Sequence, residues 1–297
     1  MAGPAGGAMA RPESSLRGTR PMTTADTLAG GLTVTQLLLG SAPVRGDRRA
    51  LIGGPDDHAY SYADLAATIQ AAAAGLTWRG LHPRDVVGVQ VPDATCYALA
   101  THSIRAAGGI PSPIAPGLSV PEIAGQLADC GARMLLTSPP LAAAGLAAAD
   151  RSWVRQVISF AEAPGAILFD SLLQSGSLRP AGGRPGDEAL LPYIRGLDGA
   201  LIPDALTQQE LAVELSAMAV TAHIAEHDIV VTAPPAGTGR AFTALLDHAL
   251  LSGATVVSAT LEGFAATAVA CHGTVAIVPC RHDLAAATSL RVLAIAS

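Results

Sequence analysis

Two pairs of cysteine and histidine lie close together near the end of the chain, as Cys271-His272 and Cys280-Arg281-His282. Thiolate and imidazole are the usual protein ligands of zinc. Zinc fingers, however, space their ligands as Cys-x₂₋₄-Cys and His-x₃₋₅-His, and adjacent residues of a strand point to opposite faces of a sheet. The spacing therefore favours buried thiols beside surface histidines, and we expect no metal site.

A glycine-rich segment, Pro234-Pro235-Ala236-Gly237-Thr238-Gly239-Arg240, lies between a predicted strand and a predicted helix, where P-loops bind nucleotides. A P-loop needs a lysine for the phosphates, followed by a hydroxyl for Mg²⁺. Here Arg240 and Ala241 occupy those two positions, and the segment has one residue more than the P-loop pattern. The segment favours a plain connecting loop, although its amides could hold an anion at the start of a helix.

The composition excludes several other kinds of chemistry. All 18 residues of the combined lysine and arginine count are arginine, so Schiff-base chemistry and a P-loop lysine are excluded. The net charge of -6 and the absence of a basic stripe disfavour nucleic acid as a partner. No apolar run is long enough to predict a membrane span. Four scattered cysteines are typical of a reducing compartment, so we expect a cytoplasmic protein.

Neighbouring acidic and histidine residues do not form a catalytic pattern. Asp247 and His248 lie on a predicted helix, and Glu226, His227 and Asp228 precede a predicted strand. Such groups are more often solvated polar faces than acid and base pairs. We therefore predict no catalytic residue.

The elements that would position any site alternate between helical and strand patterns, which predicts a layered α/β fold. The 297 residues divide into a disordered tail over 1–31, a first α/β sub-block over 32–175, a surface linker over 176–187 and a second α/β sub-block over 188–297. Capping-box spacings predict three helix starts. They lie at Ser61, Ser119 and Thr207. Strands are expected over 86–91, 133–137, 189–193, 228–232, 254–258, 274–278 and 290–295.

Several sequence blocks, in this order, resemble the amino-terminal part of AMP-forming acyl- and aryl-CoA ligases, the adenylate-forming superfamily. The resemblance covers roughly residues 33 to 297, and the order of the blocks is more specific than any one of them. The blocks are Tyr60–Leu65, Leu81–Val87, Ala106–Ile114, Glu122–Thr137, Leu250–Val257 and Ser289–Val292. The resemblance implies the fold of the family's amino-terminal domain, with the carboxy-terminal domain and its catalytic lysine absent.

The family's phosphate loop, tyr-ser-ser-gly-thr-thr-gly-leu-pro-lys-gly, aligns without gaps to residues 193–203. By resemblance, the residues left for cofactor binding are Tyr193, Arg195, Gly196, Gly199 and Thr207. Hydroxyl positions are taken by Ile194, Arg195, Leu197 and Asp198, and the lysine position by Ile202. We expect Asp198 to repel phosphate and to neutralise Arg195, which is otherwise a replacement cation.

The family's substrate pocket contains an aromatic wall and a histidine, pro-phe-phe-his-ile-tyr-gly, for which this chain has the loop that starts at Pro234. The residues left there for substrate binding are Gly237, Thr238 and Gly239. The sequence thus predicts a ligase-like protein that does not adenylate acids alone and that acts as a noncatalytic binding or regulatory module.

Two alternatives remain open: one part of a split or repurposed acyl-activating enzyme, and a product without selected activity. No cofactor is required under the first interpretation, although ATP, AMP and Mg²⁺ are the ligands that the resemblance implies. The expected partners are a full-length ligase relative or partner subunit and a small acyl or aryl ligand, with neither nucleic acid nor membrane.

Overall fold

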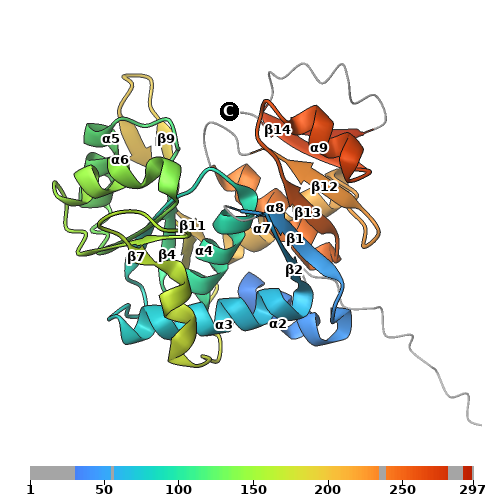
Figure 1. Cartoon of the computed structure of the whole chain (residues 1–297), viewed down its shortest axis with the longest axis horizontal. Coiled ribbons are helices and arrows are strands. Elements are labelled where there is room, and N and C mark those ends of the chain that lie inside the picture. The colour runs from blue at the N-terminus through green and yellow to red at the C-terminus, as the bar shows by residue number, and fades with distance from the viewer. Residues whose placement is uncertain (1–30, 55–56, 234–238, 280–289, 296–297) are drawn as a thin grey trace, which may run out of the picture.

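The computed structural model describes residues 31–54, 57–233, 239–279 and 290–295. The fold is α/β, as predicted, and contains two large sheets with helices packed between and around them (Figure 1). Of the expected tail, only Gly31 lies within the described residues.

The six-stranded sheet has the order β15-β14-β12-β13-β1-β2, and its strands are parallel except that β1 and β2 are antiparallel. The five-stranded sheet has the order β4-β3-β5-β6-β7 and is parallel throughout. The bounds of these strands are β1 Arg49–Gly53, β2 His58–Ser61, β3 Val86–Gln90, β4 Ile110–Pro113, β5 Met134–Thr137, β6 Gln156–Ser159, β7 Ile167–Leu168, β12 Ile229–Thr232, β13 Thr255–Ser258, β14 Val275–Pro279 and β15 Arg291–Ile295.

Two small antiparallel pairs lie outside the large sheets, and nine further elements are helical in the described ranges. The pairs are β8 Glu188–Leu190 with β11 Leu206–Thr207, and β9 Tyr193–Arg195 with β10 Leu201–Pro203. The helices are α2 Val34–Arg45, α3 Tyr62–Trp78, α4 Ala94–Ala106, α5 Val120–Asp129, α6 Pro139–Ala149, α7 Gln208–Thr221, α8 Arg240–Ser252, α9 Phe264–Ala270 and the 3₁₀ segment η1 Phe169–Ser175.

The three predicted helix starts are confirmed. Ser61 and Thr207 accept hydrogen bonds from the third helical residue, whose carboxylate binds back to the cap. At Ser119 the carboxylate of Glu122 accepts from the backbone N–H at 2.9 Å and from the hydroxyl at 2.6 Å. These caps satisfy amides that have no partner inside the helix.

Strand pairing crosses the expected sub-blocks. Leu51 and Ile52 of β1 pair with Val256 and Val257 of β13, so β1 and β2 complete the sheet formed by the later strands. Between η1 and β8 the chain has no helix or strand, and it is tied to α3 and α4 by backbone hydrogen bonds. The predicted strand over 189–193 is instead two strands, β8 and β9, separated at Pro192.

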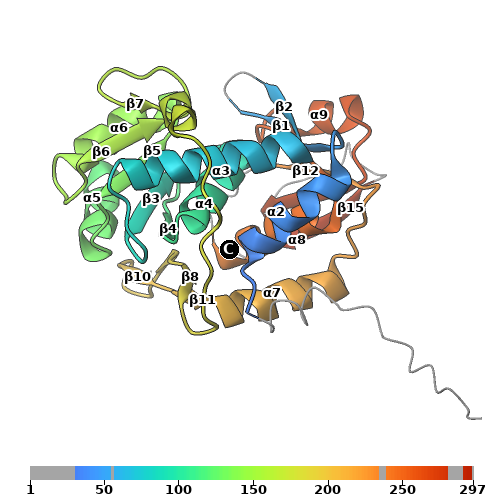
Figure 2. The ribbon, with the colours of Figure 1, turned by 90° about the horizontal axis from the view of Figure 1, so that it is seen from below.

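Helix α4 is the centre of the molecule, because every one of its 13 residues is buried. It contacts strands of both large sheets (Figure 1), while α3 crosses the molecule beside it from β2 towards the five-stranded sheet (Figure 2). A helix buried on all sides also buries its polar side chains, which then need partners. For α4 these side chains include His102 and Arg105.

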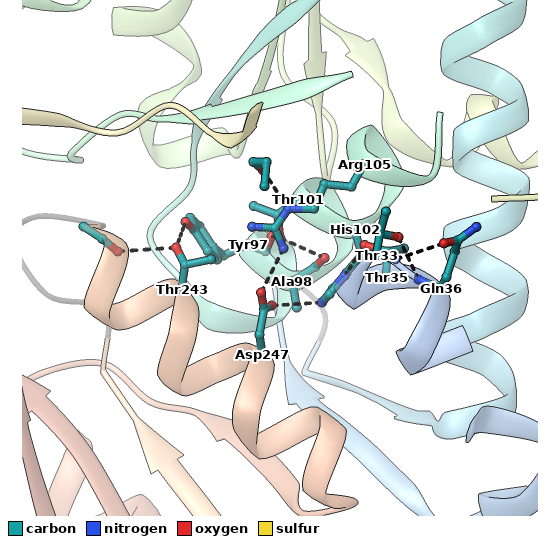
Figure 3. Close-up of polar contacts among 12 residues, drawn as sticks. Thr33, Thr35, Gln36, Tyr97, Ala98, Thr101, His102, Arg105, Thr243 and Asp247 are labelled. Carbon is teal, nitrogen blue, oxygen red and sulfur yellow. Dashed lines mark hydrogen bonds and ion pairs between the residues drawn. The ribbon is translucent and has the colours of Figure 1, made fainter. Parts of the chain in front are cut away.

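Both of these α4 side chains bind Asp247 of α8, as Figure 3 shows. Arg105 Nη1 donates to Asp247 Oδ2 at 2.9 Å, and His102 Nε2 lies 3.2 Å from Asp247 Oδ1. The network extends to α2, where Thr35 Oγ1 is 3.0 Å from His102 Nδ1, and to β8, where Arg105 Nε donates to the Ala189 carbonyl at 3.0 Å. Burial by itself would raise the pKa of Asp247, but Arg105 and His102 outweigh it and hold that pKa below its usual value.

We expect Asp247→Asn to lower the free energy of unfolding by about 3–5 kcal/mol, because the variant leaves the Arg105 charge buried without a counterion. The matched control is Glu226→Gln, whose ion pair with Arg48 is exposed and should contribute about 1 kcal/mol or less. Urea unfolding at neutral pH measures both variants. Equal losses in the two variants would contradict a special role for the buried carboxylate.

Candidate functional site

The stretch that aligns with the phosphate loop forms a hairpin. Strands β9 and β10 are antiparallel, with Ile194 opposite Ile202, and they pair with neither large sheet. The turn is closed by the Gly196 N–H, which donates to the Ala200 carbonyl at 2.8 Å. Gly199 has a φ of 83°, a left-handed conformation that favours glycine. The two glycines expected to bind cofactor thus have a structural role in the turn.

One face of the hairpin is attached to helix α5. Tyr193 Oη donates to Asp129 Oδ2 at 2.5 Å, and Arg195 Nη2 donates to Glu122 Oε1 at 2.8 Å. Alternate residues of a strand share a face, so both side chains of β9 reach the same helix. The expected neutralisation of Arg195 by Asp198 is therefore corrected: the ion-pair partner of Arg195 is Glu122, which lies 73 positions earlier in the sequence.

Arg195 makes a second contact within the turn, because its Nη1 donates to the Gly199 carbonyl at 2.7 Å. Asp198 Oδ1 accepts from the Ala200 N–H at 3.0 Å and so helps to shape the same turn. The guanidinium expected to bind phosphate thus already has a carboxylate and a carbonyl partner. A phosphate would have to displace Glu122 from it.

Glu122 serves both the hairpin and the start of α5. Its pKa is lowered to about 2, first by the hydroxyl and the N–H of Ser119 and then by Arg195. Burial raises the pKa of Tyr193, and the hydrogen bond to Asp129 raises it further. Glu122 is therefore negative and Tyr193 neutral at neutral pH.

A hollow of about 330 Å³ lies between the hairpin and α5. It is lined by Glu122, Gly125, Gln126, Asp129, Tyr193, Gly199, Ala200 and Leu201. The two carboxylates in this lining and Asp198 in the turn outnumber the one nearby cation, Arg195. An excess of negative charge repels a triphosphate, so these residues do not fit ATP.

The other face of the hairpin is apolar and exposed. Ile194 is 47% exposed and its cross-strand neighbour Ile202 is 45% exposed, while Leu197 at the turn is fully exposed. These three residues occupy positions where the resemblance implies hydroxyls and a lysine. The hairpin therefore presents hydrocarbon where an adenylating enzyme presents phosphate ligands.

Thr207 is not part of the hairpin. It is the last residue of β11 and caps α7, where its hydroxyl donates to Glu210 Oε2 at 2.9 Å and accepts from the Glu210 N–H at 3.2 Å. Both bonds belong to the capping box, so the local helix start fully explains the threonine.

In the proposed substrate loop, Gly237 and Thr238 lie outside the described residues. Gly239 is the residue before α8, and its carbonyl accepts from the N–H and the hydroxyl of Thr243, each at 3.3 Å. The next residue, Arg240, pairs with Asp204 at 3.3 Å and with Glu214 at 3.0 Å. Its guanidinium links α8 to α7, and the two carboxylates balance its positive charge.

The cysteine and histidine pairs are only partly described, because Cys280 and His282 lie outside the described ranges. Cys271 follows α9, and burial raises the pKa of its thiol. Among the described residues, no cluster of three or more histidine, cysteine or acidic side chains is arranged to hold a metal ion. Cys130 and Cys271 are free thiols.

Glu122 and Asp129 are the functional residues that the sequence did not indicate. The capping-box spacing predicted a local role for Glu122 but not its contact with Arg195. The signal available was the seven-residue interval between the two carboxylates, which places them on one side of α5. That signal identifies a face of a helix and says nothing of what lies opposite.

Comparison with known proteins places this fold and site in a family. The sequence model described as "AMP-binding enzyme" matches residues 40–276. The chain belongs to the AMP-binding enzyme family, as the resemblance implied.

Individual relatives agree with this assignment. A feruloyl-CoA synthase from Amycolatopsis sp. is 27% identical over 231 residues, which are 74% of this chain and 43% of that protein. A 4-coumarate--CoA ligase 2 from Solanum tuberosum is 24% identical over 154 residues, or 51% of this chain and 28% of the relative. The chain therefore spans less than half the length of these relatives.

Solved structures show the same fold. A long-chain-fatty-acid-CoA ligase from Archaeoglobus fulgidus has a TM-score of 0.75 at 19% identity, covering 84% of this chain and 52% of that one. A benzoate CoA ligase from Burkholderia xenovorans LB400 has a TM-score of 0.72 at 21% identity, covering 82% and 50%. In the described ranges, no helix is both long and apolar enough to cross a bilayer.

The order of causes at Glu122 is testable by NMR titration of its carboxyl carbon. We expect a midpoint near pH 2 in the native protein. Ser119→Ala should raise the pKa of Glu122 more than Arg195→Gln does, because the hydrogen bond from the Ser119 hydroxyl, which this variant removes, is the largest single cause; the backbone N–H remains in the variant. A larger rise with Arg195→Gln would contradict this order. A carboxyl group with a lowered pKa stabilises the folded chain only while it is ionised. The stabilisation from the pair of Glu122 with Arg195 is therefore lost as the pH falls through about 2.

Proposed function

We propose that this chain is a noncatalytic binding or regulatory module of the AMP-binding enzyme family, which does not activate carboxylic acids with ATP by itself. The observation that carries the proposal is the hairpin over residues 193–203, whose single cation already binds Glu122. The relatives named above are CoA ligases and a CoA synthase, and their activity is the one that we propose this chain lacks.

The argument rests on where charge develops during acid activation. Attack of a carboxylate on the α-phosphate of ATP places negative charge on the phosphate and on the leaving pyrophosphate. An enzyme must aim donors and cations at those oxygens, and losing one such donor costs about 2.7–4 kcal/mol of transition-state stabilisation. In this hairpin, hydroxyl and lysine positions carry Ile194, Leu197, Asp198 and Ile202. Several losses of this size account for an inactive hairpin.

The exposed apolar face suggests what the module binds. Ile194, Leu197 and Ile202 lie on a hairpin that α5 holds from the opposite side. Exposed apolar side chains on a fixed element are typical of a protein contact. We propose that the partner is a full-length ligase relative or another subunit, and that the chain acts in the cytoplasm, which the free thiols of Cys130 and Cys271 support.

Calorimetry with Mg²⁺-ATP tests the proposal. We expect no saturable binding by the purified chain up to about 1 mM, the concentration range of weak nucleotide binding. A feruloyl-CoA synthase that matches this chain is the positive control. Saturation at lower concentration, or acid-dependent exchange of pyrophosphate into ATP, would overturn the proposal.

A variant that restores phosphate-loop residues in the hairpin provides the matched comparison for ATP binding. The triple substitution Leu197→Thr, Asp198→Thr and Ile202→Lys restores two hydroxyls and the cation while leaving Tyr193 and Arg195 on α5. We expect ATP binding to become measurable in this variant if the hairpin is the main obstacle. Circular dichroism checks that the fold is unchanged.

A second candidate function is one part of a split acyl-activating enzyme, with the missing groups supplied by another chain. The exposed hairpin face favours it, because such a face would be covered in an assembled enzyme. Mixing the chain with a separately produced carboxy-terminal part of a matching relative should then produce pyrophosphate exchange. No exchange in the mixture would count against this second candidate.

A further inference from the structure

The five-stranded sheet has a topological switch point that lies apart from the hairpin. From β3 the chain passes through α4 to β4 on one side, and then through α5 to β5 on the other side. In doubly wound parallel sheets, ligands bind outside the carboxyl ends of the strands at such a point. The ends of β3 and β5 are therefore the place to look for a second site.

A row of polar side chains lies at those ends. Gln90 ends β3, Thr137 ends β5 and Ser159 ends β6, and the register pairs Gln90 with Thr137 and Thr137 with Ser159. Residues in register on adjacent parallel strands share a face of the sheet. All three are at most 1% exposed. The row is buried although its members are polar.

These side chains lack hydrogen-bond partners in the described part of the chain. The unpaired atoms are Nε2 and Oε1 of Gln90, Oγ1 of Thr137, Oγ of Ser159 and Oγ of the adjoining Ser138. Buried polar groups in native proteins are almost always paired with protein or with ordered water. Four of these atoms, on Gln90, Thr137 and Ser159, belong to in-register residues on one face of the sheet and need hydrogen-bond partners.

The start of helix α6 explains why Ser138 is unpaired. The hydroxyl of a residue before a helix normally accepts from the N–H of the second or third helical residue. The second residue here is Pro140, which has no N–H, and the N–H of the third, Leu141, donates to the Ser138 carbonyl at 2.9 Å. The Ser138 hydroxyl is therefore left without a donor from its own helix.

Helix α6 approaches this row with a glycine. A Cβ atom built on Gly145 would lie 3.4 Å from Gln90 Oε1 and 3.7 Å from Thr137 Oγ1. The same Cβ would lie only 3.0 Å from Leu135 Cδ2, so the glycine lets α6 pack closely over the two polar groups and enclose them.

We propose that the carboxyl edge formed by β3, β5 and β6 is a buried binding site for a small uncharged molecule, and that ordered water fills it in the isolated protein. The row contributes only hydroxyl and carboxamide groups, which donate and accept hydrogen bonds and carry no charge. The site therefore selects a neutral ligand of the same kind. It is independent of the hairpin and of the proposed function.

A crystal structure of the full chain, at a resolution that shows ordered water, tests the site directly. We expect a water molecule within hydrogen-bond distance of both the Gln90 carboxamide and Thr137 Oγ1. Direct hydrogen bonds among the side chains of the row, with no molecule between them, would overturn the proposal.

Thr137→Val gives a second measurement, because valine has nearly the same shape and no hydroxyl. If the hydroxyl binds ordered water, we expect the Tm to fall by about 2–4 °C. A Tm that stays the same or rises would mean that the hydroxyl has no partner in the native protein, and would overturn the proposal.

The matched control is Thr101→Val. The Thr101 hydroxyl donates to the Tyr97 carbonyl at 2.8 Å, within its own helix, and Thr101 is also 1% exposed. Its smaller expected change in Tm measures the general cost of exchanging a buried threonine for valine. A drop as large as that of Thr137→Val would remove the support that the Tm gives to the site.

Discussion

A carboxylate buried away from water has to be paired. In this protein the Asp247 carboxylate of α8 belongs to a network that connects α8 to α4 and, through α4, to α2 and β8. Its oxygens bind Arg105 and His102 of α4, and these two residues reach Ala189 of β8 and Thr35 of α2. Each bond fixes an angle as well as a distance. These contacts attach the central helix to α2, α8 and β8, and strands of both large sheets also contact it.

A second constraint holds the hairpin. An isolated two-stranded hairpin is marginally stable in water, so β9 and β10 need support from elsewhere. Tyr193 and Arg195 provide it by binding two carboxylates of α5. The same contacts occupy the one cation of the hairpin and leave its apolar residues facing solvent. The contacts that stabilise the hairpin are therefore the same contacts that occupy its cation.

The AMP-binding fold is present here although several residues that the resemblance implies for the phosphate loop are exchanged. The layers depend on buried apolar residues and on helix caps, which tolerate exchange of exposed loop residues. Hairpin residues such as Ile194, Leu197 and Ile202 contribute little to that core. Fold and activity are thus separable, since a site consists of a few residues carried on a scaffold.

Much of the secondary structure follows from the sequence alone, because caps and strand patterns are local. The helix starts at Ser61, Ser119 and Thr207 depend on contacts three residues apart, and the family resemblance depends on the order of short blocks. Tertiary structure decided the pairing of β1 with β13, the binding of Arg195 to Glu122 and the burial of Gln90 beside Thr137. These contacts join residues far apart in the chain, and only the packing of whole elements brings them together.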